Sequence, residues 1–171
     1  DSYEVGSRKP TIEFGDNLED DLKRRDFTVN SMALRLPSRI FVDPHQGLRD
    51  LLLETLRTPS APEISFSDDP LRMMRGARFA SQLGFELDPE AFTAMRGMAE
   101  RIEIISKERV RDELSKLLLS DNPIPGLEIL VDSGIAKLVL PELPALRLEM
   151  DEHHHHKDVY QHSLTVVSQA I

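Results

Sequence analysis

The sequence of 171 residues contains no cysteine and no tryptophan, and aromatic residues make up only 5% of it. The absence of cysteine excludes disulfides and thiolate metal sites. No apolar run approaches the about 20 residues that a membrane helix needs, and no charged-then-apolar leader opens the chain, so we expect a cytoplasmic protein without membrane contact. With so few rings, the core must consist mainly of aliphatic side chains and methionine, as helical cores often do.

The chain also lacks an excess of basic residues, because its formal net charge is −9 and its pI is about 5.1. A protein that coats nucleic acid in general is basic, so this class is disfavoured. Contact with nucleic acid would require a local basic surface on an acidic body. A small nucleotide, in contrast, needs only a few well-placed arginines.

Hydrophobic periodicity predicts a small α+β part followed by a helical array, and therefore a mostly α fold. The chain does not start with Met and ends inside a helical pattern, so we expect it to be a fragment of a longer protein. The expected elements are strands at 11–14 and 39–43, a mixed helical stretch at 18–36, a short helix at 48–53, a loop at 58–62, helices at 70–83, 88–102, 106–118 and 126–133, a break at 141–144, and a last helix after four histidines at 153–156.

The strongest local signal is Asp-Asp-Pro-Leu-Arg-Met-Met-Arg-Gly-Ala-Arg-Phe at residues 68–79, with Ser67 as the expected helix cap. Its three arginines recur every third residue and form a stripe on one side of a helix. Asp69 stands three residues before Arg72, so that a hydrogen-bond acceptor lies beside a donor. Cytosine and adenine each show an amino donor beside a ring-nitrogen acceptor, whereas uracil and guanine show the reverse. The pair is therefore suited to select C and A.

The remaining arginines of this stretch, Arg75 and Arg78, suit phosphates, because a guanidinium is a planar fork of donors. The alternative is an ordinary surface helix with acidic residues at its start and basic residues further along. Periodicity alone favours this structural alternative, since charged stripes are common on exposed helices.

Two further motifs precede this stretch. Residues 24–33 combine a basic pair, an acid, a hydroxyl and an amide, in which Arg25 is suited to a phosphate and Asp26 with Asn30 to a ribose hydroxyl. By spacing alone, a helix start with mixed polar residues is favoured. Residues 43–50 read as a tight turn between a strand and a helix, so we expect Asp43 and Asp50 to satisfy backbone donors.

In this order, the three motifs resemble those of the class II tRNA nucleotidyltransferases, the CCA-adding enzymes, and of the related bacterial poly(A) polymerases. Residues 24–30 resemble the family's Arg-Arg-Asp-Phe-Thr-x-Asn motif, and residues 68–79 resemble its amino-acid template for the incoming nucleotide. Residues 43–51 are similar to the motif between them. Residues 106–114 match the family's Ser-x-Glu-Arg-x-x-x-Glu-Leu pattern. The resemblance covers nearly the whole chain.

The resemblance implies a partial α/β nucleotidyltransferase head followed by helical neck and body domains, and the addition of C, C and A to tRNA 3′ ends from CTP and ATP with Mg²⁺. The corresponding domains are the head remnant at 1–58, the neck at 59–121, the body at 122–150 and the start of an HD-type domain at 151–171. The implied nucleotide-binding residues are Arg25, Asp26, Asn30, Asp68, Asp69, Arg72, Arg75 and Arg78. Asp69 and Arg72 would read the base, and Asp26 and Asn30 would serve the ribose.

The sequence departs from the family pattern in three places. Asp68 stands where Glu is common, which keeps the carboxylate, and Ser31 stands where Ala is common. The larger departure is that a Gly-Ser turn followed by an Asp-x-Asp strand, the combination that supplies the family's metal ligands, does not occur in this chain. We therefore expect no catalytic residue here, Mg²⁺ bound by other parts of the protein, and an inactive fragment.

The C-terminal segment 158–164 resembles the start of an HD-type phosphohydrolase domain, in which His162 would be the first metal ligand. The signature also needs a His-Asp pair and a later Asp, so His162 is half a site at most. For the histidines at 153–156, a solvated polar loop before a helix is an equally good reading.

Three alternatives to CCA addition compete. A poly(A) polymerase shares all these motifs, and nothing in the sequence separates it from a CCA-adding enzyme. A non-catalytic helical RNA-binding module would need a basic face, against which the net charge of −9 argues. An HD-domain hydrolase with an unrelated N-terminal part would leave the motifs at 24–30 and 68–79 unexplained.

Overall fold

The computed structural model describes residues 17–148 and 159–170, and it is mostly helical, as expected. The predicted strand at 11–14 and the histidines at 153–156 lie outside the described residues. None of the helices in the described part is long and apolar enough to cross a membrane.

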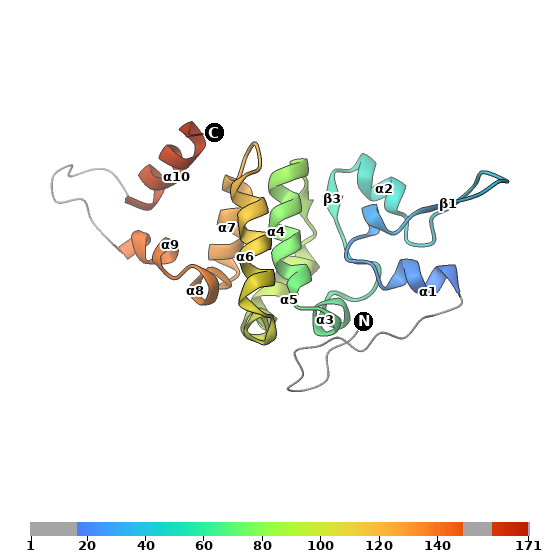
Figure 1. The fold of residues 1–171 in the computed structure, drawn as a ribbon, viewed down its shortest axis with the longest axis horizontal. Coiled ribbons are helices and arrows are strands. Elements are labelled where there is room, and N and C mark those ends of the chain that lie inside the picture. The colour runs from blue at the N-terminus through green and yellow to red at the C-terminus, as the bar shows by residue number, and fades with distance from the viewer. Residues whose placement is uncertain (1–16, 149–158, 171) are drawn as a thin grey trace.

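The N-terminal part consists of short elements that lie at one end of the molecule (Figure 1). They are α1 (Leu18–Lys23), the 3-10 turn η1 (Thr28–Asn30), β1 (Ala33–Arg35), β2 (Ile40–Val42), α2 (Gly47–Leu52) and β3 (Thr55–Leu56). Strands β1 and β2 form an antiparallel hairpin in which Ala33 pairs with Val42. The helical spacing at 29–36 was a wrong prediction, because the chain turns into this hairpin after η1.

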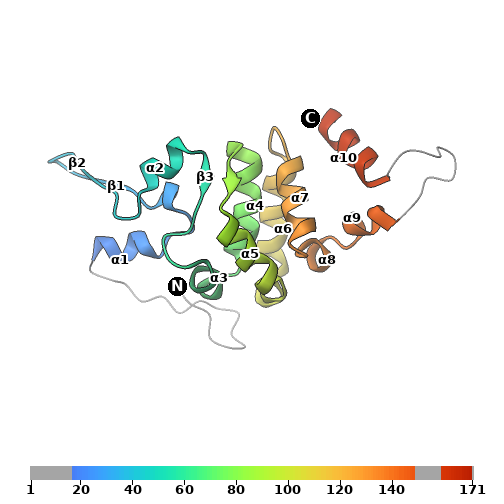
Figure 2. The ribbon, with the colours of Figure 1, turned by 180° about the vertical axis from the view of Figure 1, so that it is seen from behind.

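The centre of the molecule is a group of packed helices, seen from both sides in Figures 1 and 2. It contains α3 (Pro62–Asp68), α4 (Leu71–Leu83), β4 (Glu86–Leu87), α5 (Pro89–Met98), η2 (Ala99–Ile104), α6 (Lys107–Leu118) and α7 (Ile124–Asp132). Helix α4 packs against both α6 and α7, and α3 packs against α5. The parallel pair β3–β4 joins the N-terminal part to this group.

The C-terminal part continues with α8 (Ala136–Val139), α9 (Glu142–Ala145), η3 (Leu146–Leu148) and α10 (Val159–Gln169). The predicted break at 141–144 was wrong, because a short helix tolerates Pro141 at its N-cap and Pro144 within its single turn. Tyr160 and Leu164 of α10 are buried in the main core, and the Arg147 guanidinium lies over the Tyr160 ring at 4.5 Å.

Local signals explain three helix ends in the centre of the molecule. Asp88 caps α5 by accepting from the backbone N–H groups of Glu90 and Ala91, and Ser106 caps α6 by accepting from that of Arg109. Gly84 ends α4 in the left-handed conformation that favours glycine (φ 70°). All three were predicted.

The predicted helix cap at Ser67 was wrong. Ser67 belongs to α3, which begins with Pro62 in a stretch expected to be a loop and ends at Asp68. Pro fits the first turn of a helix because it lacks only an N–H that would have no partner there. As a result, α4 starts three residues after Asp68, and the acidic pair lies between two helices.

The buried face of α4 forms part of the main core. Met73, Met74 and Ala77 are 0–1% exposed. A second cluster of Phe27, Leu56 and Ala80 docks the N-terminal part on the same helix. Helix α4 is therefore fixed on several sides, which gives its N-terminal end a rigid support.

Candidate nucleotide-binding site

Asp69 lies at the junction of α3 and α4, where its carboxylate is held at both oxygens. Oδ1 accepts a hydrogen bond from the backbone N–H of Leu71 (3.1 Å), and Oδ2 pairs with Arg109 Nη2 (3.2 Å). The side chain of Asp69 is 18% exposed and that of Arg109 is 41% exposed. The junction thus presents an oriented, partly open acceptor.

Arg72 follows on the first turn of α4 and is buried, with 7% of its surface exposed. Nη1 donates to the hydroxyl (2.8 Å) and the carbonyl oxygen (3.3 Å) of Ser65, and Nη2 donates to the carbonyl oxygen of Arg24. Burial lowers the pKa of Arg72, while the nearby Asp69, Asp68 and Asp26 raise it. A guanidinium starts from so high a pKa that Arg72 stays charged at neutral pH.

Arg75 connects helix α4 to the motif at 24–30. Its Nη2 lies 2.6 Å from Asp26 Oδ2, and its guanidinium lies 5.8 Å from the Phe79 ring. Asp26 Oδ1 accepts from the backbone N–H of Phe27 (2.9 Å) and from Asn30 Nδ2 (3.2 Å). Asp26 and Asn30 are therefore close together, as expected of a pair that serves one ribose, although Asn30 lies on the 3-10 turn η1 and Asp26 precedes that turn.

Arg78 lies one turn further along α4 and joins it to α6. Nε pairs with Glu113 Oε2 at 2.6 Å, Nη1 donates to Gln82 Oε1 (2.7 Å), and the guanidinium covers the Phe79 ring at 4.1 Å. The Arg78 and Glu113 side chains are only 11% and 8% exposed. Arg78 therefore joins α4 to α6, with its Nε and Nη1 atoms both bonded to side-chain oxygens.

The other two predicted residues lie at the margin. Arg25 is 54% exposed and pairs with Asp21 across one turn at 3.0 Å. Asp68 is half-buried at the end of α3. The structure thus brings Asp26, Asn30, Arg72 and Arg75 together near Asp69 at the junction of α3 and α4. Arg25 and Arg78 instead pair with Asp21 and Glu113.

The aspartates of the turn at 43–50 are structural, but only one behaves as predicted. Asp43 accepts from the backbone N–H groups of Gly47 (2.6 Å) and Leu48 (3.0 Å) at the start of α2. Asp50, which we expected to satisfy backbone donors, instead accepts from the Thr28 hydroxyl (2.6 Å) and pairs with Arg57 (2.8 Å). The buried carboxylate of Asp50 therefore holds the motif at 24–30 in place through Thr28.

Sequence reasoning assigned no role to three residues that hold the site: Ser65, Arg109 and Glu113. Arg109 and Glu113 stand in the Ser-x-Glu-Arg-x-x-x-Glu-Leu pattern, four residues apart on α6, so their position on one helix face was a usable signal. Ser65 carries no such signal, because its contact with Arg72 arises only from the turn between α3 and α4.

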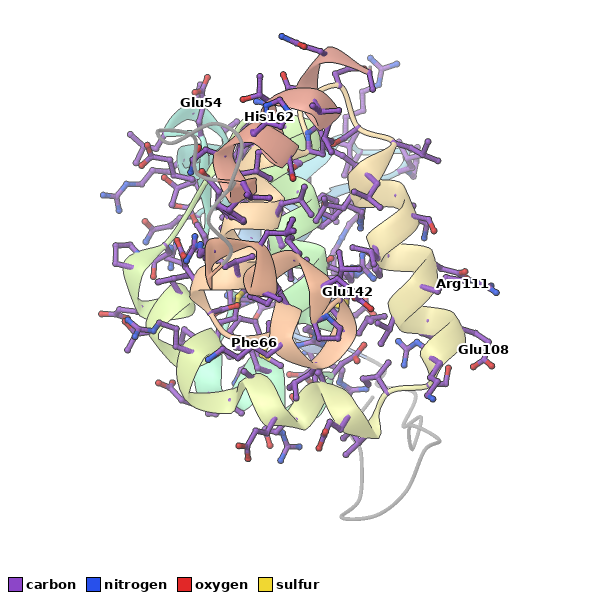
Figure 3. All side chains as sticks on the ribbon, turned by 90° about the vertical axis from the view of Figure 1, so that its left-hand side faces the viewer. Glu54, Phe66, Glu108, Arg111, Glu142 and His162 are labelled. Atoms are coloured by element: carbon purple, nitrogen blue, oxygen red, sulfur yellow. The ribbon has the colours of Figure 1, made fainter. Side chains whose placement is uncertain are left out.

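Metal-ligating residues do not gather anywhere in the described part of the chain, where no three His, Asp or Glu side chains form a candidate site. His162 is exposed on α10 (Figure 3). The acidic run at 19–21 lies on α1, where Asp21 pairs with Arg25. The described residues therefore do not fit the Mg²⁺ site of a nucleotidyltransferase.

Comparison with known families gives two matches in chain order. A family model described as the poly A polymerase head domain matches residues 1–57, and one described as a probable RNA- and SrmB-binding site of polymerase A matches residues 84–146. The CCA-adding enzyme of Streptococcus suis is 44% identical over 86% of this chain. The chain belongs to the tRNA nucleotidyltransferase and poly(A) polymerase family.

Other members of the nucleotidyltransferase family show the same relationship. The A-adding tRNA nucleotidyltransferase of Deinococcus radiodurans is 42% identical over 91% of this chain. The crystal structure of the Bacillus stearothermophilus CCA-adding enzyme in complex with CTP is 39% identical over 71% of this chain, with a TM-score of 0.66. The chain covers 36% of each of the two curated relatives and 31% of the solved chain, and thus spans about a third of their length.

Proposed function

We propose that this chain is the nucleotide-selecting part of a tRNA nucleotidyltransferase that adds CCA to tRNA 3′ ends from CTP and ATP. The observation that carries the proposal is the junction of α3 and α4, where an oriented carboxylate and a buried guanidinium stand three residues apart on a rigid support. Relatives that span this chain are named CCA-adding and A-adding enzymes, and one was solved with CTP.

The proposed base reading depends on hydrogen-bond capacity that remains after the internal contacts are made. The Asp69 carboxylate has about four lone-pair sites, and contacts with Leu71 and Arg109 use two of them. Arg72 has five N–H donors, three of which bond to Ser65 and Arg24. Asp69 would accept from the amino group of C or A, and Arg72 would donate to the adjacent ring nitrogen.

The remaining residues are proposed to hold the rest of the nucleotide. Asp26 and Asn30 would bind the ribose. Arg75 would hold Asp26 in place at 2.6 Å, and the exposed part of the Arg75 guanidinium would face the phosphates. Arg25 is exposed enough to reach a phosphate, and Asp68 would support Arg72 through its charge. Arg78 would frame the pocket through Glu113 rather than bind a phosphate.

The chemical step requires carboxylates that hold divalent metal ions, which neutralise the phosphates and activate the attacking hydroxyl. We propose that Mg²⁺ is bound by segments other than this chain. The domain layout proposed with it is a head remnant at 1–58, a neck at 59–121, a body at 122–150 and the start of an HD-type domain at 151–171, in a protein that acts in the cytoplasm.

Two related reactions compete with CCA addition. One relative is named an A-adding tRNA nucleotidyltransferase, so addition of the last A alone is a candidate. Poly(A) addition is another, because both matching family models carry polymerase names. Each uses a nucleotide site of this kind and differs in which RNA end it accepts.

The test is addition by the full-length protein that contains this chain, offered radiolabelled nucleotides and three RNAs: a tRNA without CCA, a tRNA ending in CC, and an unstructured RNA. Addition of CCA to the first supports the proposal. Addition of A only to the second would assign A addition, and long A tails on the third would assign poly(A) polymerase activity. Absence of all addition with Mg²⁺ present would overturn nucleotidyl transfer.

A further inference from the structure

Ser65 is a buried serine in α3 that lies outside every motif discussed above. It is 0% exposed and three residues before the end of the helix. A serine in this position usually satisfies itself by bonding to backbone of its own helix and is exchangeable at little cost. The contacts of Ser65 differ from this pattern, because they reach across the junction to α4.

Both base-reading residues bond to Ser65. Its carbonyl oxygen accepts from the backbone N–H of Asp69 (3.2 Å) and from Arg72 Nη1 (3.3 Å). Its hydroxyl oxygen lies 2.8 Å from the same Nη1, the shorter of the two bonds to that nitrogen. The carbonyl bonds survive any side-chain change at this position, whereas the hydroxyl bond depends on the residue being serine.

We propose that the Ser65 hydroxyl is a positioning group for nucleotide selection, which fixes the plane of the Arg72 guanidinium so that its donors meet the base at one angle. This inference rests on the proposed function. Directed hydrogen bonds discriminate between bases only if the donor is held within about 0.5 Å of the productive geometry. The two other acceptors of Arg72 are the backbone carbonyl oxygens of Ser65 and Arg24, so the hydroxyl is the contact that depends on a side chain.

Removal of the hydroxyl leaves the charge of Arg72 but loosens its orientation. A guanidinium that tilts donates to a uracil oxygen as readily as to a cytosine ring nitrogen. Ser65→Ala is therefore expected to reduce the preference for CTP over UTP and for ATP over GTP, and to leave binding of the triphosphate intact. A role confined to folding would instead lower the rate with all four nucleotides equally.

Ser133 offers a matched control. It is also buried (4% exposed), stands at a helix end, and donates from its hydroxyl to the Leu130 carbonyl oxygen at 3.2 Å. It lies after α7, and its hydroxyl bonds to the backbone of Leu130 and Ile135. Ser133→Ala removes a buried hydroxyl that bonds to backbone near its own helix, and it leaves the hydrogen bonds of Arg72 unchanged.

The experiment measures kcat/KM for CTP, UTP, ATP and GTP with the full-length protein, as wild type, Ser65→Ala and Ser133→Ala, together with each melting temperature. Hydrogen bonds to charged groups are worth enough that we expect the CTP/UTP ratio to fall about tenfold or more in Ser65→Ala. The ratio is expected to stay at the wild-type value in Ser133→Ala. In an Arg72→Ala background, Ser65→Ala should cause no further fall, because the two residues act as one unit.

An unchanged CTP/UTP ratio in an active, folded Ser65→Ala protein would overturn the inference and leave the proposed function standing. A further fall of the ratio in the Arg72→Ala background would also overturn it, since Ser65 would then act through another route. A wild-type protein that adds no nucleotide would overturn the proposed function itself, and this inference with it.

Discussion

Gly126 is a position at which helix α7 packs closely against helix α4. A Cβ atom added there would meet the Ala77 carbonyl oxygen, would lie 2.6 Å from Ser81 Oγ, and would lie 2.8 Å from Leu117 Cδ1. Ordinary contacts between such atoms are about 3.5–4.0 Å. Gly126→Ala therefore forces α7 to move by about 1 Å, because the carbonyl of α4 cannot turn aside.

The magnitude follows from three terms. Overpacking of a dense core costs about 1–3 kcal/mol. Loss of the 2.9 Å hydrogen bond from Gly126 N–H to Ser81 Oγ adds about 1 kcal/mol. The better helix propensity of Ala returns about 1 kcal/mol. We expect Gly126→Ala to lower the free energy of unfolding by about 2 kcal/mol.

Gly97 in α5 provides the control, because nothing lies within 4 Å of a Cβ added there. Gly97→Ala should raise the free energy of unfolding by up to about 1 kcal/mol through propensity alone. Urea unfolding followed by circular dichroism measures both. The reasoning is refuted if the two substitutions change stability in the same direction or if Gly126→Ala is neutral.

Two ion pairs of α6 should differ in strength according to their burial. Glu113→Ala leaves the Arg78 guanidinium, which is 11% exposed, without its carboxylate. We therefore expect the free energy of unfolding, measured in urea, to fall by about 3 kcal/mol. A fall below about 1 kcal/mol would contradict a structural role for the pair. Arg109→Ala breaks a more exposed ion pair with Asp69, so the free energy of unfolding should fall by no more than about 1 kcal/mol. Nucleotide affinity should fall measurably, because Arg109 orients the Asp69 carboxylate. Unchanged affinity would show that Asp69 does not need Arg109 to hold its orientation.

The helical body was predictable because its signals are local. Asp88 and Ser106 cap helices in the predicted places, Gly84 ends α4, and α7 lies within two residues of its predicted start. The mostly α fold, predicted from hydrophobic periodicity, and the family, predicted from the order of the motifs, are both confirmed.

The errors have two causes: a contact distant in sequence decides the conformation at 29–36, and a proline at 62 starts a helix where it also suits a loop. At 29–36 the spacing indicates a helix, but η1 is fixed from outside by Asp50, and the chain continues into a hairpin. Pro62 was read as part of a loop, although it begins α3. Because α3 was missed, the cap was placed at Ser67 and the contact from Ser65 to Arg72 was not foreseen.

The candidate site was predicted as a set of residues, and the structure supplies their arrangement. Spacing puts Asp69 and Arg72 within one helical turn. It does not reveal that Arg72 is buried, or that Arg75 pairs with Asp26, which is distant in sequence. It also does not separate Arg78, which is held by Glu113, from the other two arginines of the stripe. Such differences depend on the packing of α4 against α6 and the N-terminal part.

The most direct test of nucleotide selection is the binding of CTP, ATP, UTP and GTP to this chain, with wild type compared with Asp69→Ala, after circular dichroism has shown both to be folded. Our account predicts tighter binding of CTP and ATP by the wild type, and equal binding of all four nucleotides by Asp69→Ala. Equal binding of all four by the wild type, or an unchanged preference in the variant, would contradict base selection by Asp69 and Arg72.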